Sequence, residues 1–546
     1  MRKSHRSVLT GMLREAQSVL SQSHATGAPI DEVTAMRAER AQMVARRRVL
    51  GGALATAAAT MLPRPSLAVG QPRVLIVGAG IAGLSCALKL WSQRGIRATI
   101  YEWNTRIGGR IQTLRDYFAN GQSAEQHGEF ISSEHAATMR LAKRFGLELE
   151  NTYAAPKGTK DTYWFAGERY TQKELNADWR DFGYQLFRDA VRKASRANYQ
   201  HATKMAYHWD HMPVPEWIDR YVPGGLQGRF GKLCYSDVID EYGGPPESQS
   251  ALNLLYILGY NDSSPNGYQS PDVPMLAGSD EKWHIKGGND QLVTALASRL
   301  PDGSINLGYE LIALAENSDG SFTCTFSVGS STTEVVADHV VLTLPFTTLR
   351  NVDLSGVTLS PLKQTAIKSL PLGNNAKIQI QIAGRPWIKE GFDGGTFTDA
   401  AFDGGWDGTS YQNQGKRSPT EIFVALPGGA DGAGLASKYG LVFGNEQGPA
   451  PTRLVTDTLA GLEPIFPGVT AAWRRGPQLA WVNDGNIDRY LLGAWSQYNV
   501  GQYTGFSGVE GLREGNIHFA GEHTSIEFQG FIEGAVRSGL RAADEI

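Results

Sequence analysis

The most regular pattern of apolar and polar positions begins at residue 73 and predicts a strand, a helix and a second strand. Residues 73–80 are mostly apolar and end in a glycine-rich turn, as expected for a short buried strand. Residues 81–95 repeat apolar side chains at helical spacing, on a face formed by Leu84, Ala87, Leu88 and Trp91. Residues 96–103 again favour a strand. Elements in this order form a βαβ unit, so we predict an α/β fold.

Three glycines fall at the first strand-to-helix turn of this unit, in the G-x-G-x-x-G spacing typical of dinucleotide binding. Gly78 permits a tight turn, Gly80 lets the backbone approach a pyrophosphate, and Gly83 lets the helix pack closely on the strand. Ala82 belongs to the same turn. The helix N-terminus offers N–H groups to the phosphates. Glu102 ends the second strand, where a carboxylate accepts hydrogen bonds from ribose hydroxyls and disfavours a 2′-phosphate.

Further periodic segments predict more sheet strands and helices along the chain. Residues 309–314 and 340–345 favour strands, and residues 283–300 contain a helix. The buried face predicted for that helix is formed by Leu292, Leu296 and Leu300. Residues 517–546 predict a strand, a short loop and a C-terminal helix that follows Gly530.

Residues 1–68 form a leader with the features of an export signal. Three arginines at 46–48 precede an apolar stretch at 49–62, and small residues at 66–68 suit a signal peptidase. The apolar stretch is too short to span a membrane, so we expect no stable membrane anchor. Paired arginines before such a stretch are typical of twin-arginine signals. We therefore predict a periplasmic or secreted protein. The alternative is a basic helix retained in a cytoplasmic protein.

The composition is that of a globular protein with a large core, and it excludes few classes of function. The chain has 546 residues, enough for two or three domains, and its net charge of -3 gives no reason to expect nucleic acid as a partner. The three cysteines include no CxxC pair. The cluster of His201, His208 and His211 has no accompanying cysteine, so we interpret it as a solvated helix face and predict no metal site.

The segment after the second strand identifies the dinucleotide. Residues 104–110 (NTRIGGR) bring Gly109 and Arg110 toward the same phosphates. This segment resembles the second FAD signature of the flavin amine oxidase family, which extends from monoamine and polyamine oxidases to L-amino-acid oxidases. The resemblance covers most of Arg73 to Ile546. It implies a Rossmann-like FAD-binding domain of the glutathione-reductase-like type with an inserted α+β substrate-binding domain.

The resemblance also implies the cofactor-binding residues. Residues 124–135 (AEQHGEFISSEH) are similar to the family's acid-x-Gly-Gly segment, with Glu125 at the acid position and His127 where a glycine is usual. At the C-terminal helix, backbone N–H groups of Gly530 to Ile532 would face the flavin N1–C2=O edge. The full set is Gly78, Gly80, Ala82, Gly83, Glu102, Gly109, Arg110, Gly128, Glu129, Leu311, Glu522, Gly530, Phe531 and Ile532.

Four residues match catalytic positions of the family. Lys377 lies in an apolar strand, where the family's lysine holds a water near flavin N5. Trp495 and Phe531 take the places of two aromatic rings that form a cage for the amine, and Trp481 matches a tryptophan further back in the pocket. Ala494 occupies the position of a cysteine that attaches FAD in some members, so the resemblance implies non-covalent FAD.

The implied reaction is oxidative deamination of a primary amine or polyamine. Hydride passes from the carbon that bears the amine to flavin N5, and O2 is reduced to H2O2. An L-amino-acid oxidase, including one for basic amino acids, uses the same chemistry and is the first alternative. No arginine follows Ser132 and Ser133 until Arg140, whereas Glu129 and Glu134 lie nearby, so we favour an amine. A carotenoid-type desaturase and a non-catalytic flavoprotein are the other hypotheses.

These expectations divide the chain into six segments. The predicted FAD-binding domain comprises residues 69–150, 280–350 and 481–546, and the substrate domain comprises mainly residues 151–279 and 351–480, after the leader at 1–68. The predicted partners are a small-molecule amine or amino acid and O2. The sequence does not decide the oligomeric state, and a homodimer is one alternative. The Gly- and Asp-rich stretch at 396–418 is interpreted as a surface loop that lines an access route or an oligomer contact.

Overall fold

The computed structural model describes residues 71–546 apart from six short gaps, which are residues 154–158, 262–263, 265–266, 277, 413–417 and 445. The export signal predicted within residues 1–68 lies outside the described residues. In the described part of the chain, no helix is both long enough and apolar enough to cross a membrane.

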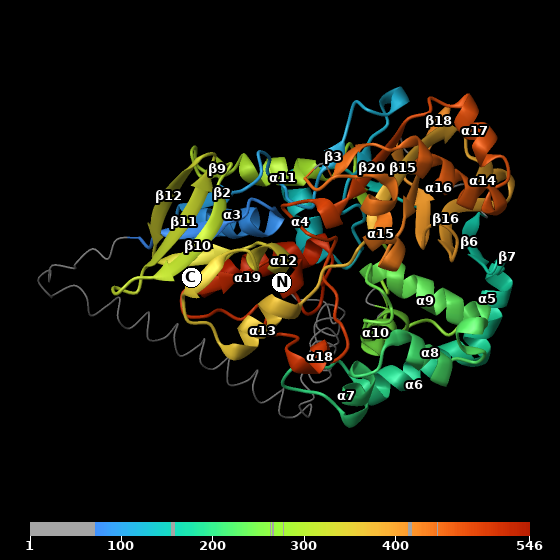
Figure 1. Cartoon of the computed structure of the whole chain (residues 1–546), viewed down its shortest axis with the longest axis horizontal. Coiled ribbons are helices and arrows are strands. Elements are labelled where there is room, and N and C mark those ends of the chain that lie inside the picture. The colour runs from blue at the N-terminus through green and yellow to red at the C-terminus, as the bar shows by residue number, and fades with distance from the viewer. Residues whose placement is uncertain are drawn as a thin grey trace, which may run out of the picture. The chain divides into compact units, whose positions relative to one another are not determined.

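The predicted βαβ unit is the centre of a five-stranded parallel sheet (Figure 1). Strand β1 (Val74–Val77) pairs in parallel with β2 (Ala98–Glu102), and helix α3 (Ile81–Arg94) connects them. The full order is β21-β13-β1-β2-β9, in which the other strands are β13 (His339–Leu342), β21 (Ile517–Phe519) and β9 (Ile305–Leu307). Residues from both ends of the described chain therefore share one sheet, and the α/β prediction is confirmed.

Glycines set the close approach of α3 to its neighbours. A Cβ at Gly83 would clash with the carbonyl oxygen of Gly78, so only glycine allows α3 to lie this close to the turn after β1. In the C-terminal helix α19 (Ile532–Glu545), a Cβ at Gly539 would clash with the carbonyl oxygen of Ala82. Helices α3 and α19 are thus packed backbone to backbone beside the predicted dinucleotide turn.

Two apolar residues lie differently from the sequence prediction. Trp91 was expected on the buried face of α3 but is 41% exposed, because it lies in the last turn before Gly95 ends the helix. Helix α11 (Asp290–Ala297) ends before Leu300, which is only half-buried. The buried faces of both helices are therefore shorter than the periodic pattern suggested.

A four-stranded sheet and an eight-stranded sheet, both of mixed strand direction, accompany the parallel sheet. A four-stranded sheet has the order β12-β11-β10-β14, with β10 (Glu310–Glu316), β11 (Phe322–Val328), β12 (Ser331–Ala337) and β14 (Asp353–Gly356). An eight-stranded sheet has the order β19-β20-β15-β18-β17-β16-β6-β7. Its strands are β6 (Lys160–Phe165), β7 (Glu168–Arg169), β15 (Ala376–Ala383), β16 (Phe392–Thr398), β17 (Gly404–Asp407), β18 (Thr420–Leu426), β19 (Gln447–Pro449) and β20 (Ala480–Asp484). Two short pairs join β3 (Thr113–Leu114) to β4 (Ala124–Glu125) and β5 (Leu149–Asn151) to β8 (Trp283–Ile285).

The stretch at 396–418, interpreted above as a surface loop, instead contributes the last three residues of strand β16 and all of β17. Both strands contain glycines, which have no side chain to pack. The alternating apolar pattern that predicts a strand is therefore weak in β16 and β17. The interpretation was wrong for these strands, and the correction matters because both border the cavity described below.

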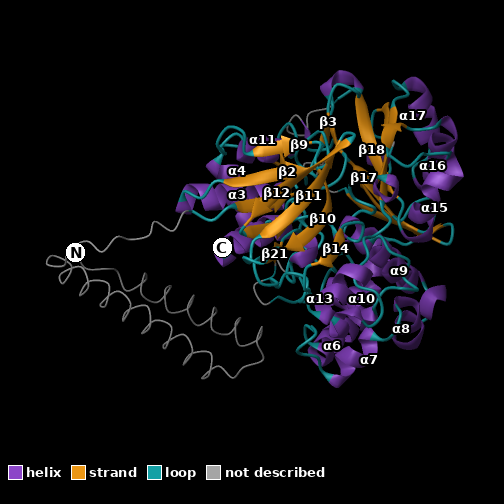
Figure 2. Cartoon of the chain, turned by 60° about the vertical axis from the view of Figure 1, so that its left-hand side comes forward, coloured by secondary structure: helices purple, strands orange, loops and turns teal. Residues whose placement is uncertain are grey.

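A group of helices lies beside the eight-stranded sheet (Figure 2). It is formed by α5 (Gln172–Asp178), α6 (Tyr184–Ala194), α7 (Lys204–Asp210), α8 (Val214–Tyr221), α9 (Arg229–Tyr242) and α10 (Ala251–Gly259). Strand β6 comes from the same stretch of chain but pairs in parallel with β16. The predicted segment 151–279 thus supplies both helices and sheet. The six segment boundaries stay predictions.

The remaining helices connect these layers or cover their edges. They are α4 (Ala136–Arg144), α12 (Phe346–Leu349), α13 (Pro361–Ser369), α14 (Pro386–Lys389), α15 (Gly429–Tyr439), α16 (Thr452–Ile465), α17 (Val469–Arg475) and α18 (Gln502–Gly505).

Candidate active site

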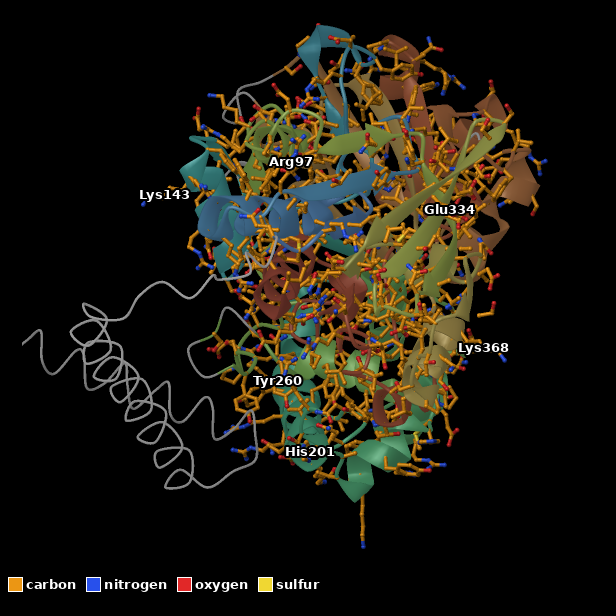
Figure 3. The ribbon with its side chains drawn as sticks, turned by 90° about the vertical axis from the view of Figure 1, so that its left-hand side faces the viewer. Arg97, Lys143, His201, Tyr260, Glu334 and Lys368 are labelled. Atoms are coloured by element: carbon orange, nitrogen blue, oxygen red, sulfur yellow. The ribbon has the colours of Figure 1, made fainter. Side chains whose placement is uncertain are left out.

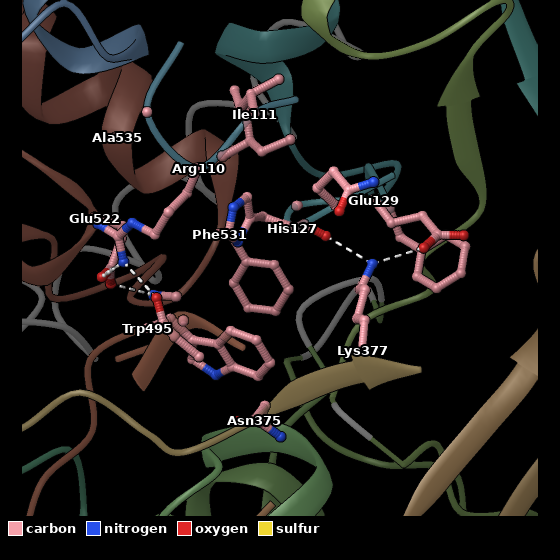
Figure 4. Close-up of a pocket in the computed structure, with 18 of the residues that line it drawn as sticks. Arg110, Ile111, His127, Glu129, Asn375, Lys377, Trp495, Glu522, Phe531 and Ala535 are labelled. Atoms are coloured by element: carbon pink, nitrogen blue, oxygen red, sulfur yellow. Dashed lines mark hydrogen bonds and ion pairs between the residues drawn. The ribbon is translucent and has the colours of Figure 1, made fainter. Parts of the chain in front are cut away.

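A cavity of about 870 Å³ extends from the turn after β1 to the eight-stranded sheet. This volume lies within the range of small-molecule and cofactor sites. Of the residues predicted to bind the cofactor, all but Gly83 line the cavity, and of the predicted catalytic residues Lys377, Trp495 and Phe531 line it. Residues more than 400 positions apart in the sequence therefore converge on one space (Figure 4).

The glycine turn at one end of the cavity is shaped for a ligand that approaches the backbone. Gly78 has a φ of 107°, and a Cβ there would clash with the Thr343 hydroxyl. By contrast, a Cβ at Gly80 would meet nothing within 4 Å, so open space lies directly over that residue. A Cβ at Gly109, in the second glycine segment, would lie only 3.5 Å from the Gly80 α-carbon. The two glycine segments therefore face the same space, which fits a pyrophosphate held by backbone.

Glu102 holds the turn together from the end of β2. One carboxylate oxygen accepts a hydrogen bond from the Ala79 N–H at 2.7 Å, and the other accepts one from the Asn104 N–H at 2.7 Å. Burial raises the pKa of this carboxyl, and the two N–H donors oppose that rise. Glu102 lines the cavity. Its predicted contact with ribose hydroxyls stays a prediction.

Glu522 is the centre of a buried polar network at the middle of the cavity. Arg110 Nη1 lies 2.7 Å from Glu522 Oε1 and also donates to the carbonyl oxygen of Ala494 at 2.9 Å. Glu522 Oε2 accepts hydrogen bonds from Ser496 Oγ at 2.6 Å and from the Gly530 N–H at 2.7 Å. Figure 4 shows the Arg110–Glu522 contact beside Trp495. The Glu522 carboxylate thus connects its own segment to three other segments around the cavity.

The N-terminus of α19 offers fewer free N–H groups than the sequence suggested. Three were expected to face a flavin, but the Gly530 N–H donates to Glu522 and the Phe531 N–H donates to the Phe528 carbonyl at 3.3 Å. The N–H of Ile532, the first residue of α19, has no acceptor among the described residues. Together with the positive end of the helix dipole, this group fits a partly negative ligand edge.

Lys377 lies across the cavity from this network, on strand β15. Its Nζ lies 2.8 Å from Glu129 Oε2 and donates to the His127 carbonyl oxygen at 2.7 Å (Figure 4). Glu129 Oε1 in turn accepts hydrogen bonds from Trp406 Nε1 at 2.9 Å and from the Tyr411 hydroxyl at 3.1 Å. The Glu129 carboxylate and the His127 carbonyl fix the position of the ammonium. Lys377 therefore presents a positioned positive charge to the cavity.

Sequence reasoning missed Trp406 and Tyr411. Both line the cavity, and Lys377 Nζ lies 5.2 Å from the centre of the Trp406 ring. Trp406 is part of β17, within the stretch interpreted as a surface loop. The sequence offered one signal, because segments interpreted as loops often carry binding residues, and this one contains Trp406 and Tyr411.

The predicted aromatic residues occupy different positions. Trp495 and Phe531 both line the cavity on the side opposite Lys377 (Figure 4). Trp495 Nε1 donates to the Glu241 carbonyl oxygen at 2.5 Å, which fixes the indole ring. Trp481 is not among the residues that line the cavity. It donates to Gln126 Oε1 at 2.9 Å and packs edge-on against Tyr117, so it supports the wall from behind.

Glu125 is a structural residue rather than a part of the cavity wall. Its carboxylate accepts hydrogen bonds from the Asn289 N–H at 2.9 Å and the Thr113 hydroxyl at 3.0 Å, and it lies 2.8 Å from His284 Nε2. Burial lowers the pKa of His284, but the hydrogen bond to Glu125 and the nearby carboxylate of Glu150, whose Oε2 lies 4.0 Å from Nδ1, raise the pKa to about 9. A charged pair therefore supports the loop that carries Gly128 and Glu129.

The histidines considered as metal ligands lie elsewhere. His208 is an exposed residue of α7, His211 follows that helix, and Figure 3 shows His201 on the outside of the helical group. Within the described residues, no group of three or more histidine, cysteine, aspartate or glutamate side chains is arranged to hold a metal ion.

Comparison with known proteins gives a single family. The family model described as flavin containing amine oxidoreductase matches residues 81–546. Among curated relatives, an L-amino-acid oxidase of Siganus canaliculatus is 27% identical, with 87% of this chain and 85% of the relative covered. A flavin-dependent L-tryptophan oxidase of Lentzea aerocolonigenes is 25% identical, with 87% and 98% covered. A flavin-containing amine oxidase of Danio rerio is 24% identical, with 87% and 85% covered.

Solved structures share the fold. Cyclohexylamine oxidase from Brevibacterium oxydans superposes with a TM-score of 0.70 at 20% identity, and covers 87% of this chain and 98% of its own. Putrescine oxidase bound to putrescine superposes with a TM-score of 0.67 at 19% identity, and covers 87% and 99%.

We predict that Glu522→Gln destabilises the protein by about 3–5 kcal/mol, because it leaves the Arg110 guanidinium without its charged partner in a buried site. Chemical denaturation measures the free energy of unfolding. The control is Glu527→Gln, which breaks the exposed ion pair with Arg537 and should cost less than about 1 kcal/mol. Equal effects of the two substitutions would contradict this account of the network.

We predict that the His284–Glu125 pair makes stability depend on alkaline pH. The pKa of His284 is higher in the folded protein than the usual 6.5, so its contribution is complete below about pH 6.5 and is lost as pH rises through about 9. His284→Gln should therefore lower the melting temperature most at pH 6 and least at pH 9. The prediction fails if the wild-type-minus-variant difference stays constant across this range.

Proposed function

Because the chain belongs to the flavin-containing amine oxidoreductase family, we propose that it is an oxidase that binds FAD non-covalently and deaminates an amine or polyamine. Because it belongs to this family, the protein is a flavin-dependent oxidase that acts on CH–NH2 groups. The observation that carries the finer proposal is the arrangement of Lys377 on one side of the cavity and of Trp495 and Phe531 on the other. Ala494 also supports non-covalent binding, since it offers no thiol for attachment.

FAD, when bound, supplies the hydride acceptor and returns the electrons to O2 as H2O2. The chain's own groups position it: the Gly80 and Gly109 segments leave room for its pyrophosphate, and the Ile532 N–H and the α19 dipole favour negative charge at the flavin edge. Residues from the turn after β1, the C-terminal helix and the eight-stranded sheet would therefore hold one extended cofactor.

The remaining side chains act on the substrate and on oxygen. The Trp495 and Phe531 rings would exclude water and orient the amine through their faces. Lys377, positioned by Glu129, would stabilise reduced oxygen or a bound water through its Nζ. No protein nucleophile is needed for this reaction.

An L-amino-acid oxidase is the second candidate, and the curated relatives favour it, since several carry that name. Such an enzyme needs a cationic group for the substrate carboxylate. Among the described residues, the lysine and arginines that line the cavity all have protein partners: Arg106 contacts the glycine segment, Arg110 pairs with Glu522, and Lys377 pairs with Glu129. This distribution of cationic side chains supports an amine as the substrate. The cavity also disfavours a carotenoid-type desaturase, because many carboxylates line it.

The direct test is peroxide release by the purified yellow protein from spermidine, benzylamine, L-arginine and L-phenylalanine. We expect turnover of an amine with stoichiometric H2O2. Turnover of amino acids alone would replace the amine assignment with the L-amino-acid oxidase alternative, and no turnover of any substrate would overturn both.

We also propose that the chain is exported through the twin-arginine signal predicted at residues 46–68. N-terminal sequencing of the native protein tests the proposal. A mature start just after Ala68 is expected, whereas a start at Met1 would contradict it.

A further inference from the structure

One carboxylate in the cavity wall has no partner in the described part of the protein. Glu281 lies just before β8 and lines the cavity. Three other acids of the same cavity, Glu102, Glu129 and Glu522, are held by protein groups. The Glu281 carboxylate, by contrast, forms no hydrogen bond or ion pair with any described residue. A carboxylate that is left free at a cavity is available to a ligand.

The backbone of Glu281 is held in a conformation that glutamate rarely adopts. Its φ of 41° lies on the positive side, which few residues other than glycine enter readily. The Glu281 N–H donates to Ser132 Oγ at 3.1 Å, and the Glu281 carbonyl oxygen accepts a hydrogen bond from Thr152 Oγ1 at 2.9 Å. Backbone strain of this kind persists only where the surrounding structure fixes it, and it is concentrated at functional sites. The starting point of the Glu281 side chain is therefore fixed from two sides.

The segment that accepts the Glu281 N–H also carries the partner of Lys377. Ile131 and Trp283 exchange two backbone hydrogen bonds, at 2.7 and 2.8 Å, so the segment of Glu281 runs beside that of Glu129. Glu129 in turn lies 2.8 Å from Lys377. The charges of Glu129 and Lys377 both act on the Glu281 carboxylate. Glu281 is therefore within electrostatic range of the lysine at the reacting end of the cavity.

Helix α9 connects Glu281 to the aromatic wall. Glu241, near the end of α9, lines the cavity, and its carbonyl oxygen accepts the hydrogen bond from Trp495 Nε1. Among the charges that raise the pKa of Glu241, that of Glu281 has the largest effect. Glu281 thus acts on groups of both walls, the one that carries Lys377 and the one that carries Trp495. A substrate nitrogen held between these walls would lie near its carboxylate.

The surroundings of Glu281 bring its pKa near neutrality. Burial, followed by the charge of Glu129, raises the pKa of Glu281 to about 7, and Lys377 opposes the rise. The charged groups coupled to Glu281 are Glu129, Glu134, Asp240, Glu241, Asp280 and Lys377. Burial raises the pKa of Glu241 well above its usual range, so that carboxyl stays protonated. Glu281 can therefore both accept and release a proton near pH 7.

An oxidase of amines must remove a proton before it removes a hydride. Alkylamines have a pKa near that of lysine, about 10, so the substrate arrives as an ammonium ion. Its nitrogen then has no lone pair to stabilise the positive charge that develops on the neighbouring carbon as hydride leaves. Burial in the cavity lowers the pKa of the ammonium and raises that of Glu281, which brings the two values closer together.

We propose that Glu281 is the catalytic base that accepts this proton from the bound substrate. The proposal rests on the proposed function. One N–H bond of the ammonium breaks, its electron pair stays on nitrogen, and the proton forms an O–H bond with the Glu281 carboxylate. The oxidation follows as hydride transfer to FAD, and Glu281 then releases its proton to water. Amines and L-amino acids share this step.

The test is the pH dependence of flavin reduction in the holoenzyme, followed anaerobically with whichever of spermidine, benzylamine, L-arginine and L-phenylalanine reacts. For the wild type we expect the rate to rise through about pH 7 and then level off, because the ionised carboxylate is the active form. For Glu281→Gln we expect a rate about 100- to 1000-fold lower at pH 7, as for loss of a general base. That rate should rise about tenfold per pH unit toward pH 10, where the substrate loses its proton unaided.

Asp280→Asn is the matched variant, because it removes a neighbouring charge and keeps Glu281. Asp280 Oδ1 accepts a hydrogen bond from the Ser133 N–H at 2.8 Å, and an asparagine oxygen can do the same. The charge of Asp280 raises the pKa of Glu281, so its removal should move the inflection to lower pH without changing the rate on the plateau. Glu281→Gly suits the positive φ, so it should keep the flavin spectrum and the melting temperature while showing the pH profile of Glu281→Gln.

Several results would overturn the assignment of Glu281. They are a wild-type rate without an inflection near pH 7, an inflection that Asp280→Asn does not move, a Glu281→Gln profile that keeps the wild-type shape, and loss of the inflection in Glu241→Gln. Each of them leaves the proposed function standing, because the substrate still reduces the flavin of the wild type. If none of the four substrates reduces the flavin, the proposed function falls, and this assignment falls with it.

Discussion

The buried carboxylate of Glu522 is the constraint on which the arrangement of the cavity depends. It follows β21, and it binds Arg110 from the second glycine segment, Ser496 next to Trp495, and Gly530 just before α19. A charge of this kind is stable in a protein interior only when every oxygen has a partner. The four segments must therefore meet in one geometry. That geometry places Trp495, Phe531 and the N-terminus of α19 around a single space.

A second buried pair holds the opposite wall. Lys377 and Glu129 connect the eight-stranded sheet to the loop after β4, and Glu125 with His284 supports the same loop from behind. Both pairs border the cavity, and the Lys377 ammonium also lies beside the Trp406 ring. The two pairs therefore fix two opposite walls of one cavity.

Local signals made the dinucleotide half of the molecule predictable from sequence. The G-x-G-x-x-G spacing predicts the distinct steric roles of Gly78, Gly80 and Gly83. Lys377 is recognisable because it is a charged residue in an otherwise apolar strand. The substrate half was not predictable, because its features arise from pairing between distant strands. Glu281 borders the site only because Ile131 pairs with Trp283, and Trp406 borders it only because a glycine-rich stretch forms β17. Backbone hydrogen bonds within a loop are equally hidden, as the N–H groups of Gly530 and Phe531 show.

The central claim is that this cavity holds a flavin against the C–H bond next to an amine nitrogen. The most direct measurement is anaerobic mixing of the purified yellow holoenzyme with spermidine, benzylamine, L-arginine or L-phenylalanine while the flavin absorbance near 450 nm is followed. The account predicts that the band bleaches within the enzyme's turnover time and returns when oxygen is admitted. A protein that binds no flavin, or whose flavin band is unchanged by every amine and amino acid, would contradict it.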